Sequence, residues 1–166
     1  MTNLNDILKN IKTIKIIGNQ SVEVKNICFD SRKATQGSVF IAVKGTTSDG
    51  HDFITVSIEK GADVIICQDL PKMINESITY VQVPDPALAL GLICSNFYGN
   101  PSEKLILVGV TGTNGKTTTA TLLYRLFREL GYRAGLLSTV INYINDDAFE
   151  ATHTTPDPVQ QNQLLS

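Results

Sequence analysis

A glycine-rich segment that ends in a lysine and three threonines is the part of this sequence whose residues point most directly to chemistry. It runs Gly109-Val110-Thr111-Gly112-Thr113-Asn114-Gly115-Lys116-Thr117-Thr118-Thr119. Glycines allow a tight turn whose backbone N–H groups point into one cavity, and a helix that begins there adds partial positive charge. A lysine at this place reaches terminal phosphates, and the first hydroxyl after it is placed to bind Mg²⁺. The segment predicts a nucleotide phosphate site in which Lys116 and Thr117 have these two roles.

The spacing of the glycines differs from the usual phosphate loop, GxxxxGK[ST], because Val110 stands where the first glycine belongs. A glycine-rich turn with an incidental lysine is the alternative interpretation. Gly-Lys-Thr-Thr at the start of a helix favours the phosphate loop. Such a loop fits a kinase, a GTPase, an ATPase or an ATP-dependent ligase, so it does not name a reaction.

The elements around this loop predict a β-α-β unit. The apolar run 105–110 indicates a strand, 116–130 an amphipathic helix that ends at Gly131, and 133–139 a second strand. Within the helix, the aromatic and leucine positions 122, 123, 126, 127 and 130 have the spacing of core residues. The sequence after 139 is polar and irregular.

The first hundred residues predict an α/β domain with a largely parallel sheet. Continuous apolar runs indicate strands that are covered on both faces. The predicted strands are 22–29, 38–43, 62–67 and 78–83, and the predicted helices are 4–11, 54–61 and 86–98, the last beginning at Pro86.

Gly99-Asn100-Pro101-Ser102 is the best candidate for a linker, because glycine and proline interrupt both helix and strand. We therefore expect two domains, 1–100 and 101–166. The second is too small to cover its own strands, and the sequence stops in a polar run. We expect the chain to be part of a longer protein, with an incomplete second domain.

Composition narrows the function. The 166 residues contain 14 Lys and Arg and 16 Asp and Glu, for a net charge of −2. That balance argues against a general nucleic-acid binder. No segment resembles a secretory signal or a membrane span, so we expect no membrane insertion. The three cysteines, Cys28, Cys67 and Cys94, have neither disulfide nor zinc spacing and are interpreted as buried thiols of a cytoplasmic protein.

Four segments together resemble the Mur ligases, which build the peptide of bacterial peptidoglycan. The phosphate loop 111–119 is similar to the ATP loop of that family. The segments 30–32 (Asp-Ser-Arg), 37–45 and 49–54 (Asp-Gly-His-Asp-Phe-Ile) look like the N-terminal UDP-sugar-binding domain of the MurE and MurF types. His153-Thr154-Thr155-Pro156-Asp157-Pro158 resembles the MurE type specifically. The resemblance covers nearly the whole chain.

The resemblance implies an ATP-dependent amide-bond ligase that uses ATP and Mg²⁺. Such an enzyme adds a diamino acid, meso-diaminopimelate or L-lysine, to UDP-MurNAc-L-Ala-D-Glu through an acyl phosphate. The N-terminal part would be a UDP-binding α/β domain, followed by the first β-α-β unit of a P-loop ATPase domain. Because the amino-acid site would lie outside it, we expect this chain alone to have no ligase activity. Its oligomeric state and the choice of diamino acid stay open.

By the same resemblance, residues of three regions contact substrates. Lys116 would be catalytic, and Thr117 would also bind the metal. The implied ATP site is Gly112, Thr113, Asn114, Gly115, Lys116, Thr117 and Thr118; the UDP-sugar site is Phe29, Ser31, Thr46, Thr47 and Ser48; the muramoyl-peptide site is His153, Thr154 and Thr155.

Several of these residues have simpler structural interpretations. Arg32 could form an ion pair with Asp30 or Asp52, and His51 could fix a loop. Phe29 and Ser31 could be a core aromatic and a polar turn. At the level of function, a MurF-type ligase that adds D-Ala-D-Ala and a non-catalytic nucleotide-binding module are the alternatives. Folylpolyglutamate synthases share a related loop but lack the N-terminal domain.

Overall fold

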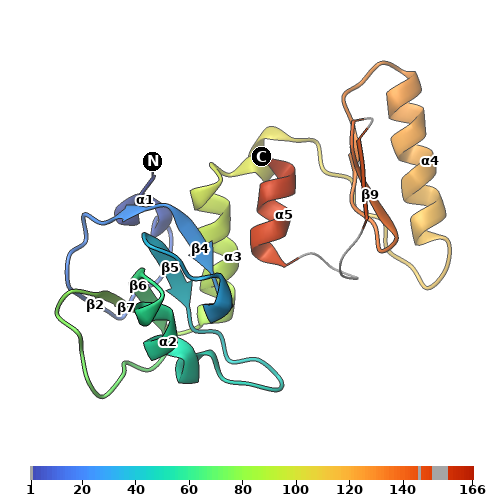
Figure 1. Cartoon of the computed structure of the whole chain (residues 1–166). Helices are drawn as coiled ribbons and strands as arrows, with labels where there is room; N and C mark the ends of the chain where they lie inside the picture. The colour runs from blue at the N-terminus through green and yellow to red at the C-terminus, as the bar shows by residue number, and fades with distance from the viewer. Residues whose placement is uncertain (1, 146, 151–156) are drawn as a thin grey trace. The chain divides into compact units, whose positions relative to one another are not determined.

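The computed structural model describes residues 2–145, 147–150 and 157–166, and the chain divides into two compact units, Met1–Pro101 and Ser102–Ser166 (Figure 1). The strands of the first unit are β1 Thr2–Asn3, β2 Lys15–Ile17, β3 Glu23–Val24, β4 Asn26–Cys28, β5 Ser38–Ile41, β6 Ala62–Cys67 and β7 Thr79–Gln82. Its helices are α1 Leu4–Ile7, α2 Ile54–Glu59 and α3 Pro86–Phe97, with short 3₁₀ turns η1 Ser31–Lys33 and η2 Gly50–Phe53. A third turn, η3 Pro101–Lys104, lies at the boundary of the two units.

The main sheet of the first unit has the order β2-β7-β6-β5-β4. Strands β4 to β7 run parallel to one another, and β2 pairs antiparallel with β7 at one edge. A separate antiparallel pair joins β1 to β3. Because β4, β5 and β6 are parallel neighbours, the segments that follow them leave the sheet at the same edge. That edge is where open α/β sheets bind ligands.

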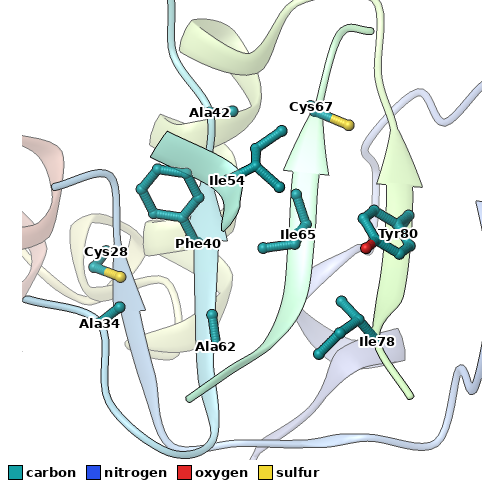
Figure 2. Close-up of a cluster of buried hydrophobic side chains, with 10 residues drawn as sticks. All are labelled: Cys28, Ala34, Phe40, Ala42, Ile54, Ala62, Ile65, Cys67, Ile78 and Tyr80. Carbon is teal, nitrogen blue, oxygen red and sulfur yellow. The ribbon is translucent and has the colours of Figure 1, made fainter. Parts of the chain in front are cut away.

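Both faces of this sheet are buried. Cys28, Phe40, Ile65 and Tyr80 are paired in register across four parallel strands and form one row of the core, which Figure 2 shows with Ile54 of α2. The side chains that alternate with this row are buried as well, including Val39, Ile41, Val64, Ile66 and Val81. A sheet covered on both faces explains why its strands are continuous apolar runs in the sequence.

Helix α3 begins at Pro86, as predicted, and hydrogen bonds at both ends hold it in place. The carboxylate of Asp85 accepts hydrogen bonds from the N–H groups of Ala87 and Leu88 at 2.9 and 3.0 Å, and Pro86 occupies the first turn. Near its other end, the Asn96 amide donates to the carbonyl oxygens of Ile7 and Lys9 at 3.0 and 2.8 Å. These bonds fasten the N-terminal helix α1 to α3.

Most predicted elements of the first unit are confirmed, but the helix predicted over 4–11 is only the four-residue α1, and β1 was not predicted. The strand predicted over 22–29 is interrupted at Lys25, because β3 pairs with β1 whereas β4 pairs with β5. Strand β2 was not predicted. It is only three residues long, and it exists through its pairing with β7.

The second unit contains α4 Lys116–Glu129, the strands β8 Gly135–Leu136, β9 Ile141–Ile144 and β10 Asp147–Glu150, and α5 Pro158–Leu165. Its three strands form an antiparallel sheet of order β10-β9-β8. The predicted β-α-β unit is therefore wrong for this chain. Residues 105–110 have no strand, the strand expected over 133–139 is reduced to β8, and the polar C-terminal stretch holds β9, β10 and α5.

The missing strand has a physical cause. A fully apolar run is stable as a strand only between neighbouring strands that pair with it and bury it. No described strand pairs with residues 105–110, and Ile106 is 97% exposed while Leu107 and Val108 are 59% and 62% exposed.

Helix α4 has the predicted bounds but not the predicted burial. Leu122, Leu126 and Leu130 are 60%, 52% and 61% exposed, so the prediction that this stripe forms a core is wrong for this chain. The helix instead contacts β8 and β9, where the rings of Tyr124 and Tyr143 stack with centroids 5.1 Å apart. The Tyr124 hydroxyl also donates to the carbonyl oxygen of Asn145. Among the described residues, no helix is both long and apolar enough to cross a membrane.

Candidate functional site: a phosphate loop and a sheet-edge site

The predicted phosphate loop leads directly into α4. Gly115 is the N-cap of this helix and has φ +76°, and Gly112 has φ +152°, backbone conformations that residues with side chains rarely adopt. A Cβ at Gly115 would meet nothing within 4 Å. The positive φ of the backbone, and not a lack of space, therefore favours glycine at this position. The loop thus makes a turn that depends on its glycines, with Val110 at the position of the usual first glycine.

The start of α4 is open to an anion. No side chain caps the helix at Gly115, so its first N–H groups have no side-chain acceptor. Residues 111–119 are all exposed. The Lys116 amine bends back over the loop and donates to the carbonyl oxygens of Gly112 and Thr113 at 2.5 and 3.3 Å. The loop therefore presents N–H donors, a helix N-terminus and a cation at one place, which suits a polyphosphate.

Thr117 lies in the first turn of α4, beside Lys116. Its hydroxyl is the group that the sequence predicts as a metal ligand. Within the described part of the chain, no cluster of three or more His, Cys, Asp or Glu side chains could hold a metal ion. A Mg²⁺ at this place would take its remaining ligands from phosphate oxygens and water, as Mg²⁺ commonly does.

The second predicted site lies at the carboxyl edge of the main sheet. Phe29 and Ser31 follow β4, and the loop of Thr46, Thr47 and Ser48 follows β5, the adjacent parallel strand. Ser31 is buried, Phe29 is half-buried, and the three loop residues are exposed. The topology brings these two segments, separated in sequence, to neighbouring positions on one edge.

An ion pair shapes the turn that contains Ser31. The Arg32 guanidinium donates to both carboxylate oxygens of Asp30, with Nε–Oδ1 2.9 Å and Nη2–Oδ2 2.8 Å. Asp30 also accepts the Arg32 backbone N–H at 2.9 Å. The hydrogen bonds from Arg32 lower the pKa of Asp30 to about 2. Of the partners considered for Arg32, the structure selects Asp30 and not Asp52.

His51 fixes a loop, as one of its interpretations predicted. Its Nδ1 lies 2.6 Å from Asp49 Oδ1, and its Nε2 accepts from the backbone N–H groups of Gln68 and Asp69 at 3.1 and 3.3 Å. The latter two residues follow β6, 17 and 18 positions further along the chain, so no local pattern could have identified them. This tie between two loops is a feature that sequence reasoning did not reach.

The cysteines are buried thiols, as predicted. Cys28, Cys67 and Cys94 are all buried, and none of them forms a disulfide. Burial raises the pKa of both Cys28 and Cys67 to about 11, so neither is a reactive thiolate at neutral pH. The predicted muramoyl-peptide residues His153, Thr154 and Thr155 lie outside the described residues.

Two family models match nearly the whole chain. The model of the Mur ligase family catalytic domain matches residues 23–98, and that of the Mur ligase middle domain matches residues 110–166. The chain belongs to the Mur ligase family. The middle-domain match begins at the phosphate loop, and the catalytic-domain match spans the sheet-edge site.

Individual Mur ligases agree with this assignment. A Cytophaga hutchinsonii protein named UDP-N-acetylmuramoyl-L-alanyl-D-glutamate--2,6-diaminopimelate ligase is 56% identical over 98% of this chain and 34% of its own length. A solved structure of a ligase with that name matches 99% of this chain and 32% of its own, with TM-score 0.68 at 21% identity, which shows the shared fold. The Thermotoga maritima MurF ligase in complex with ADP matches 64% of this chain and 24% of its own, with TM-score 0.51 at 30% identity. The chain spans about a third of the length of the curated relatives it matches.

Proposed function

We propose that the complete protein is a MurE-type ligase that joins 2,6-diaminopimelate to UDP-N-acetylmuramoyl-L-alanyl-D-glutamate at the expense of ATP. The observation that carries this proposal is the 56% identity, over 98% of the chain, to a ligase of that name. Because the chain spans 34% of that relative, the proposal gives it two tasks of the whole enzyme. These are binding of the UDP-sugar and binding of the ATP phosphates.

The first unit would bind the UDP moiety at the carboxyl edge of its sheet. Buried Ser31 has a hydroxyl that can donate to a phosphate or uracil oxygen, and Phe29 offers an aromatic face to a base. Thr46, Thr47 and Ser48 supply exposed hydroxyls on the adjacent loop. The Asp30–Arg32 pair holds the turn that presents Ser31, so we assign Arg32 a positioning role and no ligand contact.

The loop 112–118 would bind the ATP phosphates. Among the described residues, no side chain caps the start of α4. Lys116 donates to carbonyl oxygens of its own loop, which a phosphate oxygen can replace. Thr117 would provide the protein ligand to Mg²⁺, with the phosphates as further ligands. Bound Mg²⁺ would offset the negative charge of the phosphates during transfer.

This arrangement suits formation of an acyl phosphate. A D-Glu carboxylate oxygen attacks the γ-phosphorus, and ADP leaves. The amine of the diamino acid then attacks the acyl carbon, releases phosphate and loses a proton. The first step places a carboxylate beside a triphosphate, and Lys116 and the helix N-terminus offset the repulsion between these anions. His153, Thr154 and Thr155 would contact the muramoyl peptide, a role that rests on the sequence resemblance alone.

The proposed substrates also suggest where the protein acts. ATP and UDP-activated sugars are cytoplasmic metabolites, so we propose that the enzyme is cytoplasmic. The experiment is phosphate release by the complete protein with ATP, Mg²⁺ and UDP-N-acetylmuramoyl-L-alanyl-D-glutamate. Turnover that requires diaminopimelate would support the proposal. Turnover with L-lysine in its place would show that the enzyme adds L-lysine. Turnover only with the tripeptide precursor and D-Ala-D-Ala would indicate the MurF type. Binding without turnover would indicate a non-catalytic module.

A further inference from the structure

Backbone hydrogen bonds close the base of the loop that follows β5. Lys44 and Asp49 form a backbone bridge, and the Gly45 N–H donates to the Ser48 carbonyl oxygen at 2.9 Å. The Gly50 N–H donates to the Val43 carbonyl oxygen at 3.0 Å. These bonds define the shape of the loop. Where the loop leaves the sheet, the Ala42 N–H donates to the Ile66 carbonyl oxygen of β6 at 2.8 Å, which is a first attachment to that strand.

His51 attaches the loop a second time to the β6 side of the sheet. Its side chain is 18% exposed and uses both ring nitrogens. Nδ1 meets the carboxylate of Asp49 within the loop, and Nε2 meets the N–H groups of Gln68 and Asp69 after β6. One imidazole thus joins the loop that contains Thr46–Ser48 to the end of the neighbouring strand.

The partners determine which nitrogen has the proton. A backbone N–H can only donate, so Nε2 must be an unprotonated acceptor. Nδ1 therefore has the hydrogen and donates it to Asp49, 2.6 Å away. In free histidine the Nε2–H form is the more common tautomer, so the environment selects the rarer one.

We propose that His51 is a positioning residue for UDP-sugar binding, and that uptake of a second proton by its ring releases the loop and weakens that binding. The inference rests on the proposed UDP-sugar site. In the Nδ1–H form, the ring holds Thr46–Ser48 at the carboxyl edge of the sheet. These residues follow β5, and Ser31 follows β4, the neighbouring strand. A proton on Nε2 removes the lone pair that accepts both backbone N–H groups and sets N–H against N–H.

The surrounding charges do not restore the lost link. The charged residues of the joined segments are Lys44, Asp49 and Asp52 on the loop side and Asp69 on the β6 side. Asp49 favours a positive ring, but its contact is with Nδ1, inside the loop. The contacts that reach β6 are made by Nε2 to backbone N–H groups, so these are lost on protonation.

The first test needs no ligand. Long-range ¹H–¹⁵N NMR of this chain at about pH 8 should show His51 as the Nδ1–H tautomer, with signals identified by their loss in His51→Gln. On acidification from about pH 8, the amide signals of Gln68, Asp69 and Thr46–Ser48 should shift together with the ring signal of His51. An Nε2–H tautomer, or loop amides that do not follow the ring, would overturn the inference.

The second test measures binding of UDP-N-acetylmuramoyl-L-alanyl-D-glutamate by calorimetry over the same pH range. The diphosphate of this ligand does not titrate there. His51→Phe keeps a ring of similar shape without hydrogen bonds and should weaken binding about tenfold at about pH 8. His51→Gln offers an amide oxygen to the two N–H groups and should bind within about threefold of the unchanged chain, without its pH dependence.

The outcomes separate the inference from the proposed function. No binding by the unchanged chain at about pH 8 would refute the UDP-sugar site, and the inference with it. Binding that is insensitive to His51→Phe would refute the inference alone. Because His153 is the other histidine of the sequence, pH dependence that persists in His51→Gln would assign the effect to His153 or elsewhere and would also refute it. Thermal unfolding of each variant shows whether a loss reflects the loop or the whole unit.

Discussion

The backbone of Gly50 lies against that of Val43 so closely that a side chain does not fit between them. A Cβ built on Gly50 would lie 2.7 Å from both the nitrogen and the carbonyl oxygen of Val43. These are backbone atoms, which cannot rotate away as the end of a side chain can. The contact sets the base of the loop that follows β5, and it explains a glycine at this position of the Asp-Gly-His-Asp-Phe-Ile segment.

Replacing Gly50 with alanine should therefore destabilise the first unit by about 1–3 kcal/mol, the range for overpacking a tight site. Gly91→Ala is the matched control. Gly91 lies inside α3, and a Cβ there would meet nothing within 4 Å, so alanine should stabilise the helix by about 1 kcal/mol. Urea unfolding of the three chains measures both effects. Equal stability of Gly50→Ala and the unchanged chain would show that the loop base is looser than this contact implies.

The Asp30–Arg32 pair makes a prediction about pH. Hydrogen bonds from Arg32 hold the pKa of Asp30 at about 2, and Arg32→Ala should raise that pKa towards the ordinary value of about 3.9. Because the folded-state pKa is lowered, the pair contributes stability above the ordinary pKa and loses it as pH falls towards about 2. The Arg32 side chain is 85% exposed, so solvent screens the pair and its contribution to stability at neutral pH should be small.

An NMR titration of the Asp30 carboxyl group measures this shift directly. Lys33→Ala is the control, since the Lys33 side chain acts on the Asp30 carboxylate through its charge, and its removal should raise the pKa of Asp30 less than Arg32→Ala does. A pKa that stays near 2 in Arg32→Ala would assign the shift to the backbone N–H of the turn instead.

The sequence predicts an element of this fold when the residues that determine the element lie within it. Ala62–Cys67 was predicted from its continuous apolar run and Pro86–Phe97 from the proline that begins it, and both signals lie within the element itself. Strand β2 was not predicted because its three residues are too few to show an apolar pattern. They form a strand because they pair with β7. The run 105–110 shows the reverse, since its apolar pattern is strong but no described strand pairs with it.

The candidate sites follow the same rule. The glycine turn that leads into α4 was predictable because the glycines, Lys116 and the start of the helix are contiguous, and the binding of phosphate there stays a prediction. The role of His51 was predictable only in part, since Asp49 is two residues away but the N–H groups of Gln68 and Asp69 come from a distant loop. Arg32 had two nearby carboxylates as candidates, and only the structure distinguishes Asp30 from Asp52.

The buried cysteines should resist alkylation in the folded chain. Cys28 and Cys67 are 2% and 0% exposed, and burial raises the pKa of each to about 11. At about pH 8 both access and thiolate fraction are low, so iodoacetamide should react about 100-fold or more slowly than in the denatured chain. Mass spectrometry of timed samples measures each site. Rapid labelling of either cysteine under native conditions would mean that the sheet opens readily.

Lys116 is the residue on which the proposed enzyme depends most. In the complete protein, Lys116→Ala should lower turnover by more than about 100-fold, because removal of one electrostatic donor to a transition state typically reduces the rate by about 10²–10³. The amine already lies over the loop, 2.5 Å from the Gly112 carbonyl oxygen, so a phosphate bound at the start of α4 would be within its reach. The measurement is phosphate release at saturating substrates.

Lys60→Ala serves as the matched control, since Lys60 is an exposed lysine at the end of α2, in the other unit. It should leave turnover unchanged. Lys116→Arg keeps the positive charge but replaces the compact ammonium group with a planar guanidinium, so it should recover only part of the rate. The Asp30–Arg32 pair and the sheet are untouched by these changes, so UDP-sugar binding should persist in all three variants. Normal turnover in Lys116→Ala would show that the glycine-rich segment is not the phosphate site, even if the UDP-sugar site is correct.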